Sequence, residues 1–161
     1  MGYYAAIHEN NISLSENRLN NALEAFRELC EKDRHFSWVD KRAVEQALEN
    51  PNKVLAVTAC FREWGYEMAP HEENVFCRLR DGIDAVLYLL HREREKWGDD
   101  ETLWETLARH SAIDESCYIR FRGEDGCLWG YRFQPAGTLN KDFVVGGFLY
   151  ETASITWKPA T

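Results

Sequence analysis

The residues from Cys117 to Phe133 constrain the fold more than any other segment of this chain. Their sequence, CYIRFRGEDGCLWGYRF, alternates apolar and polar side chains on both sides of a Glu124-Asp125 pair that glycines bound. Alternation with a period of two is typical of half-buried strands, and a short glycine-containing turn joins two such strands into an antiparallel hairpin. The segment therefore predicts a β-hairpin within a largely antiparallel sheet.

Helical periodicity dominates much of the chain before this hairpin. Apolar side chains recur at spacings of three and four in the segments 19–30, 40–49, 54–64 and 103–108. The sequence from Ser13 to Glu16 predicts a capping box for the first helix, and Asn50-Pro51 predicts a restart within the second helical region. Gly65 is expected to end that region, and Asp99 or Asp100 to cap the last helix.

Short apolar runs predict further strands. We expect them at 3–8, 35–39, 66–68, 74–79, 83–90, 143–145, 148–150 and 154–157. Arg80-Asp81-Gly82 predicts a second hairpin turn, and Gly146-Gly147 a bulge or a turn. This pattern favours a single α+β domain over residues 1–161, with two layers: a largely antiparallel sheet of roughly five to seven strands and three or four helices packed on it.

The composition indicates a compact acidic protein. Of the 161 residues, 45% are hydrophobic and 13% aromatic, enough apolar surface to offset the entropy of ordering the chain. The formal net charge is −8, from 27 acidic and 19 basic side chains. Such a surface repels phosphate backbones and anionic lipids, so we expect no nonspecific nucleic-acid binding and no membrane association. The same charge favours a basic protein partner.

The cysteines and the absence of export signals predict a cytoplasmic location. Five cysteines occur without a C-x-x-C motif, mostly among apolar residues, as free buried thiols do. No apolar run approaches the roughly 18 residues that a membrane span requires, and no signal peptide opens the sequence. A reducing compartment fits this pattern best.

Several short motifs together resemble a known group of proteins. They are Gly2-Tyr3-Tyr4, the sequence from Ile12 to Asn17, the sequence from His35 to Asp40, the acidic start of the helix at Asp100, and the hairpin to Phe133. The chain resembles a family of small uncharacterised α+β proteins of bacteria, notably actinobacteria, and their phages. It departs from the family's pattern after Gln134 and in the region 72–90. The resemblance implies an accessory protein, encoded either by a bacterium or by a phage. It implies no catalytic residue.

No catalytic residue, metal ligand or cofactor is predicted from the motifs. The histidines lack the spacing of metal ligands, and neither a phosphate-binding glycine loop nor a nucleophile elbow is present. Gly123 and Gly126 are explained by the hairpin turn, and the paired carboxylates at Glu124-Asp125 and Asp99-Asp100 by turn and cap chemistry.

The candidate ligand site lies on the hairpin, at Tyr118, Arg120, Arg122, Trp129 and Tyr131. Arg120 and Arg122 share one face of their strand, and Trp129 and Tyr131 share a face of the next. An arginine pair near an aromatic ring suits a nucleotide or another small anion, because guanidinium groups grip phosphate or carboxylate while a ring stacks on a base. This hypothesis predicts a concave pocket beside the hairpin. The alternative is that both arginines balance nearby acids on a solvated sheet face.

Three classes of function follow. The first is a non-enzymatic binding protein that engages a protein partner, for example as an inhibitor of a host defence system. The second is a small-ligand or nucleotide-binding protein that uses the hairpin site. The third is an enzyme whose site is assembled from distant residues such as His35, His71 and Glu124, which then have to converge within hydrogen-bond reach.

Overall fold

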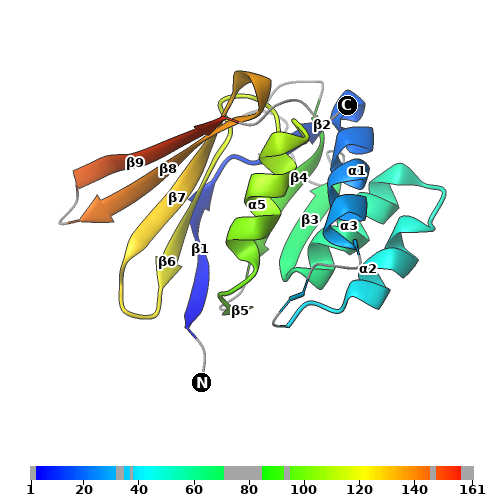
Figure 1. Ribbon diagram of the computed structural model, residues 1–161, viewed down its shortest axis with the longest axis horizontal. Coiled ribbons are helices and arrows are strands. Elements are labelled where there is room, and N and C mark those ends of the chain that lie inside the picture. The colour runs from blue at the N-terminus through cyan, green and yellow to red at the C-terminus, as the bar shows by residue number, and fades with distance from the viewer. Residues whose placement is uncertain are drawn as a thin grey trace.

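Two antiparallel sheets and four α-helices make up the described part of the chain (Figure 1). This computed structural model describes residues 3–31, 35–36, 38–70, 85–92, 95–145 and 148–156. The large sheet has the strand order β5-β1-β6-β7-β8-β9, and the small sheet the order β2-β4-β3. The strands are β1 Tyr4–Asn10, β2 Ser13–Ser15, β3 Tyr66–Pro70, β4 Ala85–Arg92, β5 Glu95–Lys96, β6 Tyr118–Gly123, β7 Leu128–Gln134, β8 Thr138–Val145 and β9 Phe148–Thr156.

The helices gather on one side of the strands. Figure 1 shows α5 between the large sheet and a group formed by α1, α2 and α3, and α5 contacts both β8 and α1. The α-helices are α1 Leu19–Leu29, α2 Lys41–Leu48, α3 Lys53–Glu63 and α5 Asp100–Arg109, and the short 3₁₀ helices are η1 Glu16–Arg18 and η3 Pro135–Gly137. The fold is therefore the expected α+β domain with helices layered on antiparallel strands. None of the helices in the described residues is both long and apolar enough to cross a membrane.

The two sheets are joined through β1 and β2, which follow each other along the chain. Asn11 N–H donates to the Tyr118 carbonyl beside the large sheet at 3.1 Å. The next carbonyl, that of Ile12, accepts from Leu89 N–H of the small sheet, also at 3.1 Å. One extended segment thus supplies a strand to each sheet and keeps their edges together.

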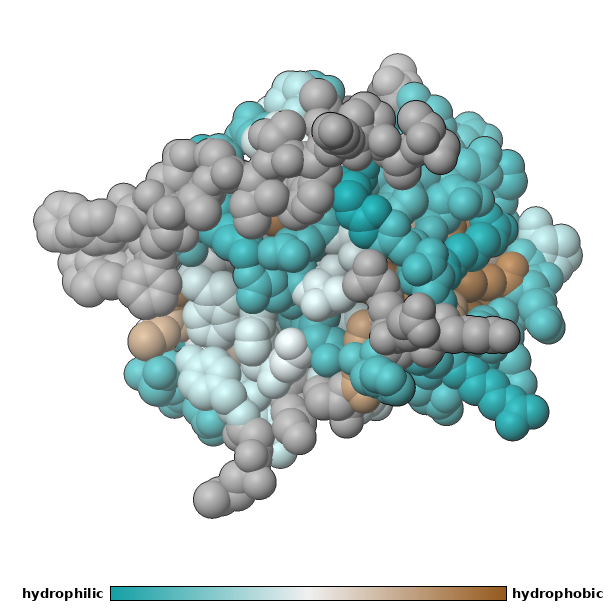
Figure 2. Space-filling model, in the orientation of Figure 1, coloured by the Kyte–Doolittle hydropathy of each residue, from teal (hydrophilic) through white to brown (hydrophobic). Residues whose placement is uncertain are grey.

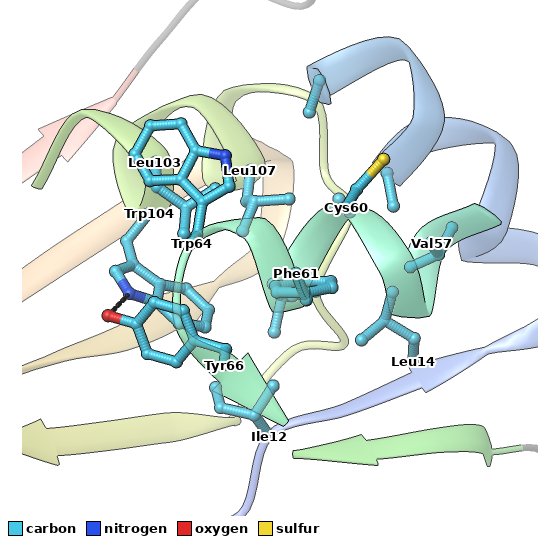
Figure 3. Close-up of a cluster of buried hydrophobic side chains, with 14 of the residues drawn as sticks. Ile12, Leu14, Val57, Cys60, Phe61, Trp64, Tyr66, Leu103, Trp104 and Leu107 are labelled. Atoms are coloured by element: carbon cyan, nitrogen blue, oxygen red, sulfur yellow. Dashed lines mark hydrogen bonds between the residues drawn. The ribbon is translucent and has the colours of Figure 1, made fainter. Parts of the chain in front are cut away.

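Aromatic side chains fill the core between the helices and the sheets (Figure 3). Trp104 of α5 lies 5.2 Å from Tyr66 and 6.1 Å from Phe61, measured between ring centroids, and Phe26 of α1 lies 5.1 Å from Phe61. All four are fully buried. Burying one such ring contributes on the order of 2 kcal/mol, so this cluster holds α1, α3, α5 and β3 together.

Most of the predicted helical faces are confirmed. The residues Leu19, Ala22, Leu23, Phe26 and Leu29 are buried on α1, as their spacing predicts, and Cys30 is half-buried. Asp40 caps α2 by accepting from the backbone N–H groups of Arg42 and Ala43. Gly65 follows α3 with φ +86°, the left-handed conformation that ends many helices.

Two local predictions are wrong. Ser13 and Glu16 do not form a capping box: Ser13 lies in β2, and Ser15 precedes the 3₁₀ helix without capping it through its side chain. Pairing with β4 overrides the local capping signal, since Ser13 lies opposite Tyr88. The described residues of 35–39 form no strand. The predicted restart at Asn50-Pro51 is confirmed: α2 ends at Leu48 and α3 begins at Lys53, with Pro51 directly before the N-cap.

The predicted strands elsewhere are confirmed in outline. The hairpin forms as β6 and β7, and residues 143–145 and 148–156 belong to a longer strand pair, β8 and β9. The short strand β5 was not predicted, because its two residues lie in a charged stretch. The predicted strand 74–79, the turn at Arg80-Asp81-Gly82 and the glycines Gly146-Gly147 lie outside the described residues.

Candidate functional site

A cleft of about 860 Å³ lies among the described residues. It opens where the end of β1, the strand β2, the start of β4 and the loop after α5 meet. A cleft of this volume is in the range of small-molecule sites. Its side chains are predominantly polar, and they are graded from a buried floor to an exposed rim.

Ser13 and Cys117 form the floor of the cleft. Both are 5% exposed, and the Ser13 hydroxyl lies 3.8 Å from the Cys117 sulfur, within reach of a weak hydrogen bond. The pairing of β2 with β4 holds Ser13 in place. Two backbone hydrogen bonds hold Cys117: its carbonyl accepts from Phe133 N–H, and its N–H donates to the Asp114 carbonyl. The floor therefore offers a hydroxyl and a thiol in fixed positions.

Asp114 organises one wall of the cleft. Its carboxylate accepts from the Ser15 backbone N–H and from the Ser15 hydroxyl, both at 2.9 Å, and lies 3.3 Å from Nε of Arg18. Arg18 also donates from Nη1 to the Ser111 carbonyl at 2.8 Å. Arg18, the one positive charge among the described lining residues, is thus balanced within the wall itself.

The rest of the lining is small or polar. Asn11 is half-buried, and its amide oxygen accepts from Tyr118 N–H at 2.6 Å. Ala85 and Val86, at the start of β4, supply the apolar part of the wall. The rim consists of the exposed side chains of Glu16, Asn17, Glu115 and Ser116.

Ser116 has a left-handed backbone at the rim, with φ +69°. Its N–H donates to the Phe133 carbonyl at 2.9 Å, and this bond holds the loop against β7. A non-glycine residue in this region costs about 1 kcal/mol or more, and such strain is concentrated at functional sites. The loop conformation that shapes the cleft is therefore maintained against a local cost.

The structure places the five predicted site residues on two opposite faces of the large sheet. Tyr118, Arg120 and Arg122 lie on the face away from the helices, whereas Trp129 and Tyr131 lie opposite Phe121 and Ile119 on the helix side. The face assignments within each strand are confirmed. The two groups do not meet, because one lies above the sheet and the other below it.

Arg120 is engaged on its own face, as the alternative interpretation expected. It donates to Glu9 of β1 at 2.6 Å, and its guanidinium carbon lies 5.5 Å from the Tyr118 ring centre. Arg122 is exposed and lines a shallow hollow of about 360 Å³ together with Ala6 and the turn residues Gly123, Glu124 and Gly126. A concavity beside the hairpin therefore exists, but it contains only one of the five predicted residues.

Trp129 and Tyr131 belong to the aromatic packing of the helix side. Trp129 is half-buried, with its ring centre 5.0 Å from that of Trp97 and 5.9 Å from that of Phe121. Tyr131 is 4% exposed and lies 6.1 Å from Phe121. Both rings contribute to the core.

A fully buried ionic network lies elsewhere, at the start of α5. Arg92 Nη1 is 2.5 Å from Asp100 Oδ1, and both side chains have 0% exposure. The Tyr66 hydroxyl donates to Asp100 at 2.7 Å and accepts from Arg92 and from Trp104 Nε1, both at 3.1 Å (Figure 3 draws the last bond). Burial raises the pKa of the Asp100 carboxyl, although Arg92 and the hydrogen bonds from Tyr66 and Gly98 act in the opposite direction.

Two further groups of candidates from the sequence are the residues of the enzyme hypothesis and the carboxylates of the hairpin turn. His71 lies outside the described residues, so the enzyme hypothesis built on it stays a prediction. Asp125 is held in the hairpin turn by Tyr3 and by Cys127 N–H, as turn chemistry predicts, and the Tyr3 hydrogen bond lowers the pKa of its carboxyl. Within the part of the chain that the structure describes, no three metal-ligating side chains lie together.

Sequence reasoning missed the cleft because its residues come from three distant segments. Residues 11–18, 85–86 and 114–117 have no shared motif, and the sequence from Ser13 to Glu16 matched a capping box instead. The pairing of β2 with β4 and the contacts of Ser13, Ser15 and Arg18 with Cys117 and Asp114 bring these segments together.

Comparison with known proteins adds no relative: no protein-family model, no curated protein and no solved structure matches this chain.

Proposed function

We propose that this protein binds a small polar ligand in the cleft above Ser13 and Cys117. The cleft itself carries the proposal: about 860 Å³ of space with a buried polar floor and an exposed polar rim. Ligand sites typically combine concavity with a few fixed polar groups that orient the ligand. The proposal keeps the small-ligand class expected from the sequence and moves its site away from the hairpin.

The charges of the lining favour a neutral or cationic ligand. Arg18 is balanced by Asp114, and the remaining charged side chains among the described lining residues, Glu16 and Glu115, are acidic. A phosphate group would meet net negative charge here, on a protein whose formal charge is already −8. Nucleosides, sugars, polyols and amino sugars suit the cleft better than nucleotides.

A thermal-shift screen with two matched variants tests this function. The probes are nucleosides, monosaccharides, polyols and amino sugars, with nucleotides as the anionic comparison. Selective binding to the folded state raises the melting temperature by mass action. We expect a shift that Ser13→Ala weakens and that the double variant Arg120→Ala/Arg122→Ala retains.

The two variants make the outcome diagnostic. Loss of the shift in the arginine double variant, with the shift intact in Ser13→Ala, would move the binding site to the hairpin face. No shift with any probe would contradict the small-ligand function.

A protein partner is the second candidate, and the acidic charge is the observation that favours it. Figure 2 shows one face of the molecule on which the described residues are mostly hydrophilic, with only small hydrophobic areas. An electrostatic partner surface predicts binding that weakens between about 50 and 500 mM salt, as screening shortens the range of charge interactions. Binding of a protein partner that does not change with the salt concentration would contradict an electrostatic partner surface.

The location and the family context belong to the same proposal. Cys30, Cys60, Cys117 and Cys127 are free thiols, which suits a reducing cytoplasm. The resemblance to small bacterial and phage proteins stays a prediction. Inhibition of a host system by this protein also stays a prediction. Cell fractionation with an antibody against the native protein tests the compartment.

A further inference from the structure

Two elements run between the cleft and the buried ionic network. The strand β4 begins at Ala85, which lines the cleft, and ends at Arg92. The helix α5 begins at Asp100 and leads into the loop that carries Asp114 and Cys117. Figure 1 shows α5 rising from the end of the molecule that holds β5 toward the end that holds β2. The 10 residues of α5 span about 15 Å, so the network acts on the cleft only through these elements.

The ion pair fixes the ends of β4 and α5 that lie away from the cleft. Arg92 and Asp100 are fully buried, and the Arg92 guanidinium also lies over the rings of Tyr66 and Trp97, with its carbon 5.0 and 5.6 Å from their centres. A buried ion pair has few alternative arrangements, because separating the two side chains would leave each charge buried without a counter-charge.

The Tyr66 hydroxyl connects this ion pair to the neighbouring strand, β3. Tyr66 is the first residue of β3, and its register partner in β4 is Arg92. Its hydroxyl contacts Asp100 at the start of α5 and Trp104 one turn later. The small sheet and the helix are thus connected by directional bonds as well as by ring packing.

The other end of α5 is tied rigidly to the cleft. Ser111 N–H donates to the Ala108 carbonyl and Ala112 N–H to the Leu107 carbonyl, both at 2.9 Å, which closes the helix end as a Schellman motif. The Ser111 carbonyl in turn accepts from Arg18 of the cleft wall. A shift of α5 therefore moves the loop that holds Asp114 and Cys117.

We propose that the Arg92–Asp100 pair is a positioning device for the cleft. It fixes α5 relative to β4 at the far end and thereby sets the spacing between two of the segments that line the cleft. The role of the pair in binding rests on the proposed function. Its effect on the position of α5, and so on the shape of the cleft, does not depend on any ligand. Arg92 and Asp100 touch no ligand and act only through the elements that they join.

The thiol of Cys117 reports the state of the cleft floor. We compare iodoacetamide alkylation of the wild type with that of Arg92→Met/Asp100→Leu, which replaces the ion pair by apolar side chains of similar size. Peptide mass spectrometry follows each cysteine separately. Exposed Cys127 controls for reagent, and Cys60, buried in the core, controls for global unfolding.

We expect Cys117 to react about tenfold faster in the double variant, while the rates of Cys60 and Cys127 stay unchanged. Tyr66→Phe, which keeps the ion pair but removes the connecting hydroxyl, is expected to give a smaller increase in the same direction. Should the double variant fail to fold, Tyr66→Phe carries the test.

Two results would overturn the inference. An unchanged Cys117 rate would show that the network does not position the cleft. A parallel rise for Cys60 and Cys117 would show that the network only stabilises the fold. Because alkylation needs no ligand, either result stays separate from the outcome of the ligand screen.

Discussion

Two serines adopt backbone conformations that glycine adopts more readily. Ser111 has φ +54° and Ser116 has φ +69°, and they stand at either end of the short connection that leads from α5 to the cleft. Ser111 occupies the left-handed position after the helix that is most often glycine. Its side chain accounts for no hydrogen bond of the Schellman motif, which uses backbone groups alone.

Ser111→Gly is therefore expected to stabilise the protein. Relief of the left-handed strain exceeds the entropy cost of glycine, so the free energy of unfolding should rise by about 0.5 to 1 kcal/mol. Urea denaturation measures the change. Glu49→Gly is the control, since Glu49 follows α2 with φ −76° and should lose stability. A loss in Ser111→Gly would contradict the strain argument.

At this scale the sequence predicts faces better than partners. The period of two placed Arg120 and Arg122 correctly on one side of their strand, because alternation is a local property. The residue that engages Arg120 is Glu9, 111 positions earlier in the sequence. No local pattern identifies such a partner, so the arginine pair was a plausible anion site until the strand order was known.

Among the elements, the β6–β7 hairpin depends on one close approach. Gly130 of β7 lies opposite Arg120, and a Cβ added to it would be 2.2 Å from the Ile119 carbonyl oxygen and 3.0 Å from the Arg120 side chain. Arg120 therefore lies across the sheet where Gly130 has no side chain. The glycine makes room for the Ile119 carbonyl and for Arg120 of the facing strand.

Gly130→Ala should destabilise the hairpin severely. The obstacle is backbone, which cannot move without breaking the ladder, so we expect a loss of about 3 kcal/mol in the free energy of unfolding. Gly126→Ala is the matched control, with φ +85° but open space around the added atom, and should lose about 1 kcal/mol. Thermal denaturation followed by circular dichroism compares them. Equal losses of stability in the two variants would show that the steric clash at Gly130 is not the cause of its effect.

Long elements with strong periodicity were predictable, and short ones were not. The helix α1 buries the face that its spacing indicated, since an amphipathic stripe determines which side packs. The strand β2 has three residues and is defined by its pairing with β4 rather than by its own sequence. Ser13 and Glu16 consequently looked like a capping box although they belong to the cleft.

Across the whole molecule, a buried charge pair holds the small sheet to α5. Arg92 and Asp100 stabilise each other only as a pair, because each alone is a charge without solvent. Their net contribution to stability is therefore small, whereas the cost of removing either one is large.

This reasoning predicts strong non-additivity. Arg92→Met alone should lower the free energy of unfolding by about 3 to 5 kcal/mol, while Arg92→Met/Asp100→Leu should stay within about 1 to 2 kcal/mol of the wild type. Guanidinium denaturation of the single and double variants, with Asp100→Leu completing the cycle, measures the coupling. Additive losses would contradict the role of the pair.

The cleft could not be predicted from the sequence because it is a property of the assembled sheets. Its floor residues, Ser13 and Cys117, are 104 positions apart and approach only when β2 and the loop before β6 are in place. Composition and periodicity were sufficient for the fold class, since helices and strands bury their apolar faces by local rules. A cleft depends on where those rules leave space.

The path of β1 also has a consequence for how the chain is made. Tyr3 bonds Asp125, 122 positions later, and β1 lies between β5 and β6 in the finished sheet. During synthesis the first strand leaves the ribosome without either neighbour, whereas α1, α2 and α3 can already pack on one another. The strand β1 is thus translated before both of the strands that flank it and reaches its place late, and a nascent chain halted before β5 would carry β1 as an unpaired strand.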